Sequence, residues 1–286
     1  MLIAMSDAQA PNASQAAYWN DLAGLTWAEL SPLLDRQIEG VGAAAIAAFA
    51  PQAGERLLDV GCGCGQTTLA LAGKVGPGGA VVGLDISRPM LAVAAERARA
   101  AGLANVSFVE ADAQTHAFEP ASFDGLFSRF GVMFFSDPTA AFHNLLGALK
   151  PCGRLVFACW RSIAENPIMS APMAAASRHL TPPPPPEPGA PGPFAFADPE
   201  RVRDILSSAG FGRIEITPFD TQMGGNTLED ALKLALRVGP LGAQLRENPG
   251  LAPTIIDEVR KMLAGHLRDG AVWMDGAVWI VTARRP

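Results

Sequence analysis

Short apolar runs alternate with amphipathic, helix-like segments between residues 55 and 161. Two of these segments begin with strong helix-start signals, because Ser87 with Pro89, and Asp137 with Pro138, pair a capping side chain with a first-turn proline. Regular alternation of strand and helix favours right-handed crossovers and a doubly wound parallel sheet with helices on both faces. The predicted strands are residues 57–60, 80–85, 106–110, 124–128 and 154–160.

The pattern changes after Trp160. Residues 163–197 include an unbroken proline run at 182–186, which excludes one long helix and favours an extended, semi-rigid segment. We expect this segment to form a lid over the ligand-binding edge of the sheet. A surface excursion and a docking motif for another protein are the alternatives.

Two more strands are predicted near the carboxyl terminus. A helix that begins at Asp198-Pro199 leads to a strand at 213–218, and the last strand is 277–283. Residues 220–270 between them are predicted to be a helical insert, with a capping box at Thr227 and Asp230 and a second helix over 254–267. We expect this insert to form a second wall of the ligand site, or alternatively a homodimer contact.

The first strand runs into the loop Asp59-Val60-Gly61-Cys62-Gly63-Cys64-Gly65. Alternate glycines allow a sharp turn and a close ligand approach, which a side chain at Gly61, Gly63 or Gly65 would block. The acid Asp59 would repel a phosphate and suits a cationic ligand. A dinucleotide fingerprint would place its third glycine one residue later, where Gln66 stands. The loop therefore favours a positively charged cofactor.

Acids also follow the next two predicted strands. Asp85 lies twenty positions after Gly65, where a carboxylate can accept hydrogen bonds from both ribose hydroxyls, and Asp112 follows the third strand. The alternative is that each acid merely caps the turn or helix after it. Three acids at successive strand ends nevertheless predict a nucleoside site.

These residues resemble the motifs of class I S-adenosylmethionine-dependent methyltransferases over residues 55–161. The resemblance implies an α/β fold with a doubly wound, Rossmann-like, mostly parallel seven-stranded sheet, and an Asp112 that receives the adenine amino group. The implied cofactor is S-adenosyl-L-methionine. The implied cofactor-binding residues are Asp59, Gly61, Cys62, Gly63, Gly65, Thr67, Asp85, Ile86, Met90, Asp112, Ala113 and Ser128.

Residues 128–161 are similar to the small-molecule branch of this family, which includes quinone and sterol methyltransferases. Many members of that branch have Gly at the position of Cys152. The resemblance implies in-line methyl transfer to an O, S, N or C nucleophile of a small, apolar or aromatic acceptor. We expect acceptor contacts from Tyr18, Trp19, Arg129, Phe130, Met133, Trp160 and Arg161.

Each acceptor-side residue also has a plainer explanation. Aromatic and methionine side chains commonly pack in the core, and Arg129 and Arg161 at strand ends can pair with neighbouring carboxylates in a structural role. Methyl transfer from a sulfonium needs no catalytic base, so no catalytic residue is assigned. His179, within the predicted lid, is the best of the weak candidates for a base.

Composition narrows the classes of partner. The chain has 286 residues, a net charge of −6 and a single tyrosine, which disfavours nucleic acid. The first residues lack the features of a signal peptide, and the apolar stretch 41–50 is too short for a membrane span, so we expect a cytoplasmic protein. The four cysteines lack the spacing of a zinc site or a disulfide framework, so no metal is predicted.

The predicted organisation has four parts: an N-terminal helical cover (1–54), a cofactor-binding core (55–162), a proline-rich lid (163–197) and the remainder of the sheet with its insert (198–286). Two other functions stay open. An NAD-dependent oxidoreductase would use Asp85 equally well but leaves Asp59 and the glycine spacing unexplained. A protein that binds the cofactor without transferring methyl groups would show the same motifs.

Overall fold

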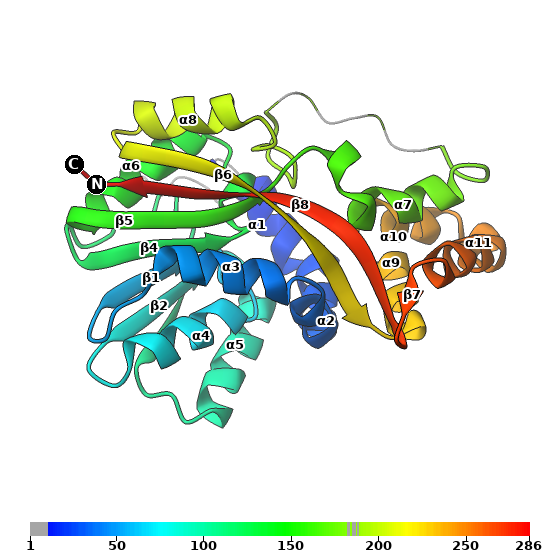
Figure 1. Cartoon of the computed structure of the whole chain (residues 1–286), viewed down its shortest axis with the longest axis horizontal. Coiled ribbons are helices and arrows are strands. Elements are labelled where there is room, and N and C mark those ends of the chain that lie inside the picture. Colours follow the sequence, from blue (N-terminus) through cyan, green and yellow to red (C-terminus); the bar gives the residue numbers. More distant parts are fainter. Residues whose placement is uncertain (1–10, 182–183, 185–186, 188) are drawn as a thin grey trace, which may run out of the picture.

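The central sheet has the strand order β3-β2-β1-β4-β5-β8-β6 in the computed structural model, which describes residues 11–181, 184, 187 and 189–286 (Figure 1). The first five strands are parallel, whereas β8 runs antiparallel to β5 and β6. The prediction of a doubly wound, mostly parallel sheet is confirmed. The strands are β1 (Arg56–Val60), β2 (Ala80–Asp85), β3 (Val106–Glu110), β4 (Phe123–Arg129), β5 (Leu149–Trp160), β6 (Gly212–Asn226), β7 (Leu267–Arg268) and β8 (Ala271–Arg284).

Helices cover both faces of the sheet. Phe127 of β4 is paired with Val156 of β5, so the next residue, Phe157, points to the opposite face. Phe49 packs on Phe127 at a centroid distance of 5.5 Å, and Phe142 packs on Phe157 at 5.6 Å. The face with Phe49 carries α3 (Glu39–Phe49), α4 (Gln66–Val75) and α5 (Arg88–Ala100), and the face with Phe142 carries α6 (Pro138–Ala148) and α8 (Pro199–Ser208).

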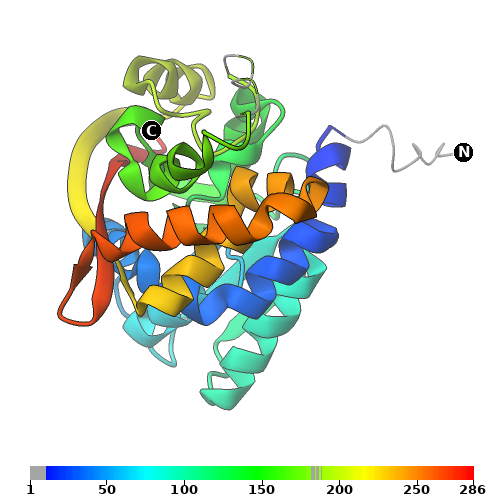
Figure 2. The same ribbon diagram turned by 90° about the vertical axis from the view of Figure 1, so that its right-hand side faces the viewer.

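Two helices precede this core. Helix α1 (Ala13–Asn20) has no buried residue, and a single extended residue, Asp21, separates it from α2 (Leu22–Gln37). Helix α2 contacts α5 on one side and α9 (Leu228–Arg237) and β6 on another, as Figure 2 shows. Residues 11–49 are therefore mostly helical, and α2 joins the sheet domain to the helices at the carboxyl-terminal end.

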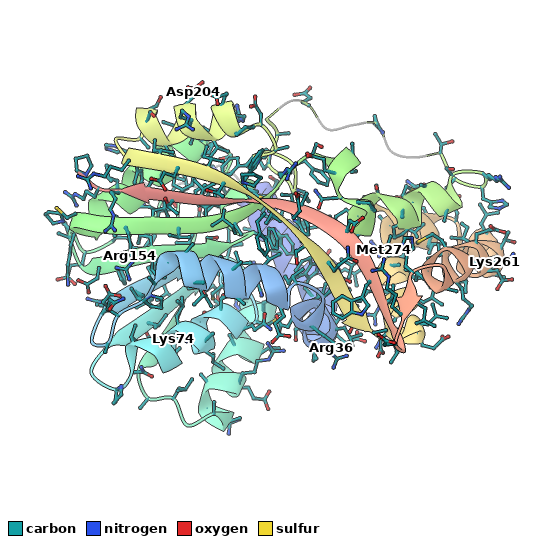
Figure 3. All side chains as sticks on the ribbon, in the orientation of Figure 1. Arg36, Lys74, Arg154, Asp204, Lys261 and Met274 are labelled. Atoms are coloured by element: carbon teal, nitrogen blue, oxygen red, sulfur yellow. The ribbon has the colours of Figure 1, made fainter. Side chains whose placement is uncertain are left out.

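The antiparallel ribbon β6–β8 is longer than predicted. Pairing continues through Thr221 with Gly276 and Met223 with Met274, so the predicted helical insert 220–270 begins inside β6 and ends in the turn between β7 and β8. The prediction was wrong at these boundaries because glycines and polar residues interrupt the apolar pattern where the ribbon leaves the sheet. Figure 3 shows Met274 on this outer part of β8.

The ribbon leads to a helical subdomain made of α7 (Pro167–Ala176), α9, α10 (Gly239–Glu247) and α11 (Ala252–Ala264). It has its own apolar core, which includes Leu232, Ile255 and Val259. The predicted cap of α9 is present, because the Asp230 amide donates to Thr227 Oγ1 at 3.2 Å. Helix α10 was not predicted, since it begins at a Gly-Pro pair. Short 3₁₀ turns are η2 (Val132–Phe134), η3 (Ile163–Glu165) and η4 (Pro249–Leu251).

The proline-rich segment is only partly described. Its first part folds as η3 and α7, whereas most of the run 182–186 lies outside the described residues. The lid role of residues 163–197 therefore stays a prediction. Within the described part of the chain, no helix is both long and apolar enough to cross a bilayer.

The predicted Pro151-Cys152-Gly153 turn lies inside β5, where the pairing register with β4 shifts. Cys152 has a φ of 63°, in the left-handed region that favours glycine and costs other residues about 1–2 kcal/mol. Glycine, which we expect at this position in many relatives, adopts this backbone conformation without that cost.

Replacing Cys152 by Gly should raise the free energy of unfolding by about 1 kcal/mol, because it relieves the left-handed conformation. Urea denaturation measures the change. Ala174→Gly, in the exposed interior of α7, is the matched control and should lower stability by a similar amount. A Cys152→Gly protein no more stable than the wild type would contradict this explanation.

Candidate functional site

The glycine loop after β1 has two kinds of glycine. All three residues have positive φ, but a Cβ at Gly61 would lie 2.6 Å from Gly131 Cα, and one at Gly65 would lie 2.9 Å from Ala94 Cβ. At Gly63 the nearest atom is Met90 Sδ at 3.8 Å. Packing against Gly131 and against Ala94 is therefore enough by itself to require glycine at positions 61 and 65, and the role of these two residues in ligand binding stays a prediction. Gly63 alone faces open space.

The Asp59 carboxyl is completely buried at the end of β1. Its Oδ2 accepts hydrogen bonds from the hydroxyls of Thr67 and Thr68, both at 2.7 Å, which joins the strand to the first turn of α4. Its Oδ1 makes no hydrogen bond to any described residue, and burial raises the pKa of the carboxyl. A buried acceptor without a donor is the feature that a bound cation would complete.

The Asp85 carboxyl lies at the end of β2 and is also buried. The Gly63 amide donates to Oδ2 at 2.7 Å, and the Ser87 amide donates to Oδ1 at 2.8 Å. Burial raises the pKa of Asp85 to about 6, and these two amides oppose the shift. Each carboxylate oxygen keeps a second lone pair, so the group can still accept hydrogen bonds from a diol.

The third acid, Asp112, lies beyond β3 and meets a residue that the sequence did not single out. Asn12 Nδ2 donates to both carboxylate oxygens of Asp112 at 2.9 Å. The neighbouring Ala113 is buried, and its backbone amide has no acceptor among the described residues. This strand end therefore presents a carboxylate beside an unpaired amide, a pattern suited to a nucleobase edge.

The N-terminal helices contact the same edge of the sheet. Ser87 Oγ donates to the Trp19 carbonyl at 2.6 Å, and Asn20 bonds both to the Ile86 carbonyl, at 2.8 Å, and to the Arg88 amide, at 2.9 Å. The Trp19 ring packs edge-on against Trp27 and Phe134. Helix α1 thus lies directly over the turn that follows Asp85.

Comparison with known proteins identifies this arrangement. A family model described as a methyltransferase domain matches residues 57–153, which hold the glycine loop and all three acids. Nocamycin O-methyltransferase of Saccharothrix syringae is 29% identical over 247 residues, which is 82% of this chain and 86% of that protein. The match places a class I S-adenosylmethionine-dependent methyltransferase domain at residues 57–153.

Two further similarities agree. Aklanonic acid methyltransferase DauC of a Streptomyces strain is 38% identical over 107 residues, and the match spans 37% of this chain and about half, 49%, of that relative. A solved structure of phosphoethanolamine N-methyltransferase 2 from Haemonchus contortus in complex with S-adenosyl-L-methionine has a TM-score of 0.53 at 22% identity. It covers 86% of this chain and 52% of that chain, and supports the fold alone.

Both arginines that were predicted to contact the acceptor have structural partners. The Arg129 side chain, which is 11% exposed, hydrogen-bonds Gln66 Oε1 and lies 3.5 Å from Asp35. Arg161 pairs with Glu165 and Asp220, and its guanidinium lies over the Trp279 ring. These contacts favour the structural explanation of both residues.

The other predicted residues divide between core and surface. Phe130 stacks on Trp160 with centroids 4.4 Å apart, and Met133, which is 1% exposed, belongs to the main core. Ser128 is fully buried, and its hydroxyl donates to the Val60 carbonyl at 2.7 Å, so it is used inside the sheet. Tyr18 and His179 are exposed, and His179 follows α7 of the helical subdomain.

Asp35 of α2 is a connecting residue that sequence reasoning missed. It accepts from Arg97 of α5 at 2.7 Å and pairs with Arg129, while Arg97 also donates to the Cys64 carbonyl of the glycine loop. Its partners are 62 and 94 positions away, so no local spacing signals the contact. The cover helix α2 and the glycine loop are therefore linked through one part-buried ion pair.

Three of the four cysteines are buried. Cys62 and Cys64 are buried within the loop and Cys159 within β5, and burial raises the pKa of all three, that of Cys64 to about 11. Thiols in this state stay protonated at neutral pH. This agrees with the interpretation that they fill tight space.

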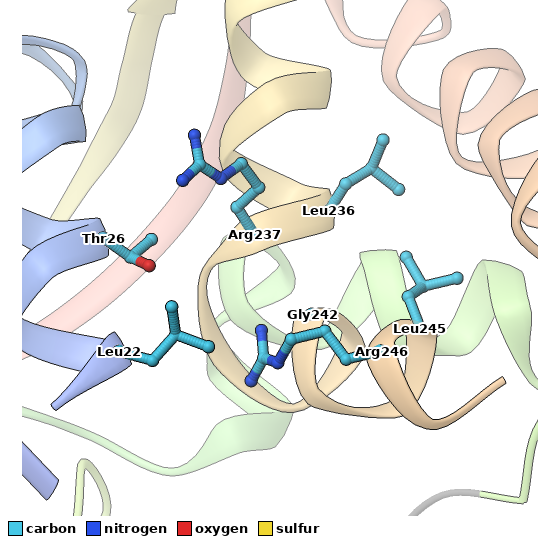
Figure 4. A pocket seen from close by; sticks show the side chains of 7 residues that line it. All are labelled: Leu22, Thr26, Leu236, Arg237, Gly242, Leu245 and Arg246. Carbon is cyan, nitrogen blue, oxygen red and sulfur yellow. The ribbon is translucent and has the colours of Figure 1, made fainter. Parts of the chain in front are cut away.

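Two cavities border the helical subdomain. One of about 270 Å³ lies between α2, α9 and α10, and Arg237 and Arg246 extend beside its apolar side chains (Figure 4). Arg237 is already paired with Glu29 of α2. The second, of about 100 Å³, is bounded by α2, α7, the ribbon and α9–α11, and we call it the subdomain cavity.

Cofactor binding should weaken as the pH falls through about 6. Protonation of Asp85 converts one acceptor oxygen into a donor, so the affinity for S-adenosylhomocysteine should decrease between pH 7.5 and pH 5. Asp85→Asn should cost about 1.5–3 kcal/mol of binding free energy at pH 7.5 and remove the dependence.

Isothermal titration across this pH range makes the measurement. Glu110→Gln is the control, because Glu110 ends the neighbouring strand but is paired with Arg88 at the surface. Its pH dependence should match that of the wild type. An Asp85→Asn variant that kept the full dependence would assign the titration to another group.

Proposed function

We propose that this methyltransferase moves the methyl group of S-adenosylmethionine to an acidic oxygen, such as that of a phenol or enol, of a small apolar acceptor held in the subdomain cavity. The observation that carries the proposal is the lining of that cavity. Its only polar side chains are Gln37 and Asn226, and none is titratable. The lining residues are Leu34, Gln37, Ile168, Met169, Pro172, Met173, Gly224, Asn226, Ala231, Leu234, Ala235, Val238, Gly239, Pro240, Leu241, Leu263, Val272 and Met274.

The cofactor would be held by the three strand-end acids. The unpaired Oδ1 of Asp59 suits the cationic amino-acid part, Asp85 suits the ribose diol, and Asp112 with the Ala113 amide suits adenine. Cys62, Ile86 and Met90 would contribute contacts around them. The cofactor supplies an activated methyl group on a sulfonium, and the protein aligns the acceptor and excludes water.

The lining implies that the acceptor reaches the cavity ready to react. Neither Gln37 nor Asn226 can remove a proton, and Asn226 is already bonded to the Leu33 carbonyl at 3.0 Å and to Arg36 at 3.1 Å. The acceptor oxygen must therefore lose its proton to solvent before transfer. The sulfur–methyl bond then breaks as the oxygen–methyl bond forms. The name of nocamycin O-methyltransferase supports an oxygen acceptor.

The cavity is small, so acceptor entry requires side chains to move. Three of its lining residues are methionines, Met169, Met173 and Met274, whose unbranched side chains repack readily. Apolar acceptors of different outline can be accommodated in this way. This supports selection by apolar character and acidity rather than by an exact polar contact.

Product analysis tests the proposal. With deuteriomethyl-labelled S-adenosylmethionine and a panel of phenols, enols, thiols and amines, the label should appear on oxygen, and the rate should rise with pH along the pKa of each acceptor. A rate profile that is the same for acceptors of different pKa would indicate a base on the protein. Absence of product from every acceptor, with the cofactor bound, would favour a binding protein without turnover.

Filling the cavity should separate acceptor binding from cofactor binding. Ala235→Phe should raise the KM for the acceptor about tenfold or more, whereas the affinity for S-adenosylhomocysteine should stay unchanged. Ala264→Phe, at the exposed end of α11, is the matched control and should change neither. An unchanged acceptor KM in Ala235→Phe would place the acceptor elsewhere.

The dinucleotide alternative is not supported, because the family model and the relatives are methyltransferases. Titration with NADH beside S-adenosylhomocysteine checks this directly. The dimer contact and the cytoplasmic location stay predictions. Size-exclusion chromatography with light scattering tests the dimer.

A further inference from the structure

We propose that the chain carries its own occupant of the nucleobase site: the carboxamide of Asn12 holds the Asp112 carboxylate until the adenine of the cofactor displaces it. The inference rests on the assignment of Asp112 to adenine under the proposed function. It goes beyond that assignment because it makes the N-terminal segment a competitor of the cofactor.

The Asn12 side chain is fully engaged and only 4% exposed. Its Nδ2 donates to Asp112 at 2.9 Å and to Gln114 Oε1 at 3.1 Å, and its Oδ1 accepts from the Ser136 amide at 2.8 Å. An amino donor beside an acceptor is also the pattern of the adenine edge, where N6 lies next to N1. Asn12 Nδ2 thus takes at Asp112 the donor position that the adenine amino group would take, while the Ala113 amide is left without an acceptor among the described residues.

The local structure of α1 indicates that this contact is not a helix cap. Asn12 stands at the N-cap position, where an asparagine side chain normally accepts a hydrogen bond from the first turn. Here it makes no such bond and reaches a residue 100 positions along the chain. The Asn12 side chain therefore binds Asp112 and does not cap the first turn of α1.

Adenine and Asn12 cannot use Asp112 in the same way at once. Asn12 Nδ2 lies equally close to both carboxylate oxygens, and the Gln114 amide takes a further position on Oδ1 at 2.9 Å. Asn12 is buried, and its bonds to Asp112 are part-buried. Cofactor binding therefore requires the first turn of α1 to move away.

The first turn can move at low cost. Helix α1 buries none of its residues, so its opening exposes little apolar surface. Its last residues stay attached through the Trp19 carbonyl and Asn20, and Trp19 remains packed on Trp27. Only molecules with an open first turn can bind the cofactor. The apparent affinity is therefore the affinity of the open form multiplied by the fraction of molecules that are open.

Removing the carboxamide should strengthen cofactor binding. Asn12→Ala is expected to bind S-adenosylhomocysteine about tenfold more tightly than the wild type in isothermal titration. Asn20→Ala is the matched control, because it loosens the same helix without touching Asp112, and it should bind no more tightly than the wild type. Unchanged or weaker binding by Asn12→Ala would overturn the proposal, and weaker binding would make Asn12 a cofactor ligand.

A second variant and a rate measurement test the same proposal independently. Asn12→Asp sets a like charge against Asp112 and should also bind more tightly at pH 8. In stopped-flow fluorescence of the tryptophans, the wild-type association rate should level off at high ligand concentration, whereas that of Asn12→Ala should keep rising. If S-adenosylhomocysteine bound none of these proteins, the cofactor assignment itself would fall; equal binding by all of them would remove only the role of Asn12.

Discussion

The buried carboxylate of Asp85 joins the parts of the molecule on which cofactor binding depends. It accepts from the Gly63 amide of the glycine loop and from the Ser87 amide at the start of α5, and the Ser87 hydroxyl in turn donates to the Trp19 carbonyl of α1. Burial of a charge is unfavourable unless hydrogen bonds compensate it, and here the compensating donors are the backbone elements that shape the site. Loop, helix start and N-terminal segment are therefore set by one group.

Helix α2 extends this connection to the helical subdomain. On one side Asp35 pairs with Arg97 and Arg129, and on another the Leu33 carbonyl accepts from Asn226 at the end of the ribbon β6–β8. The subdomain has its own apolar core, so it packs as a unit and meets the sheet domain through α2, α7 and the ribbon. Helix α2 is thus linked to the glycine loop through Arg97 and also lines the subdomain cavity.

Several residues that chemistry suggested for the site are explained by structure instead. Arg129 and Arg161 pair with carboxylates. The Ser128 hydroxyl of β4 donates to the Val60 carbonyl of β1. Glycine is required at positions 61 and 65 by the close approach of Gly131 and Ala94. A loop that must turn sharply and a strand end that must be tightly packed use the same residue types that a ligand requires. The residue types at strand ends therefore predict where a site lies more reliably than they predict what each residue does there.

The sequence alone determined the alternation of strands and helices, the glycine loop and the acids Asp59, Asp85 and Asp112, because these signals depend on local backbone geometry and on short spacings. Only the tertiary structure decided that the ribbon β6–β8 runs past the sheet, that Asp35 binds two arginines and that Asn12 meets Asp112. In these three side-chain contacts the partners lie 62 to 100 residues apart. Their pairing follows from how the helices pack on the sheet, which no local pattern encodes.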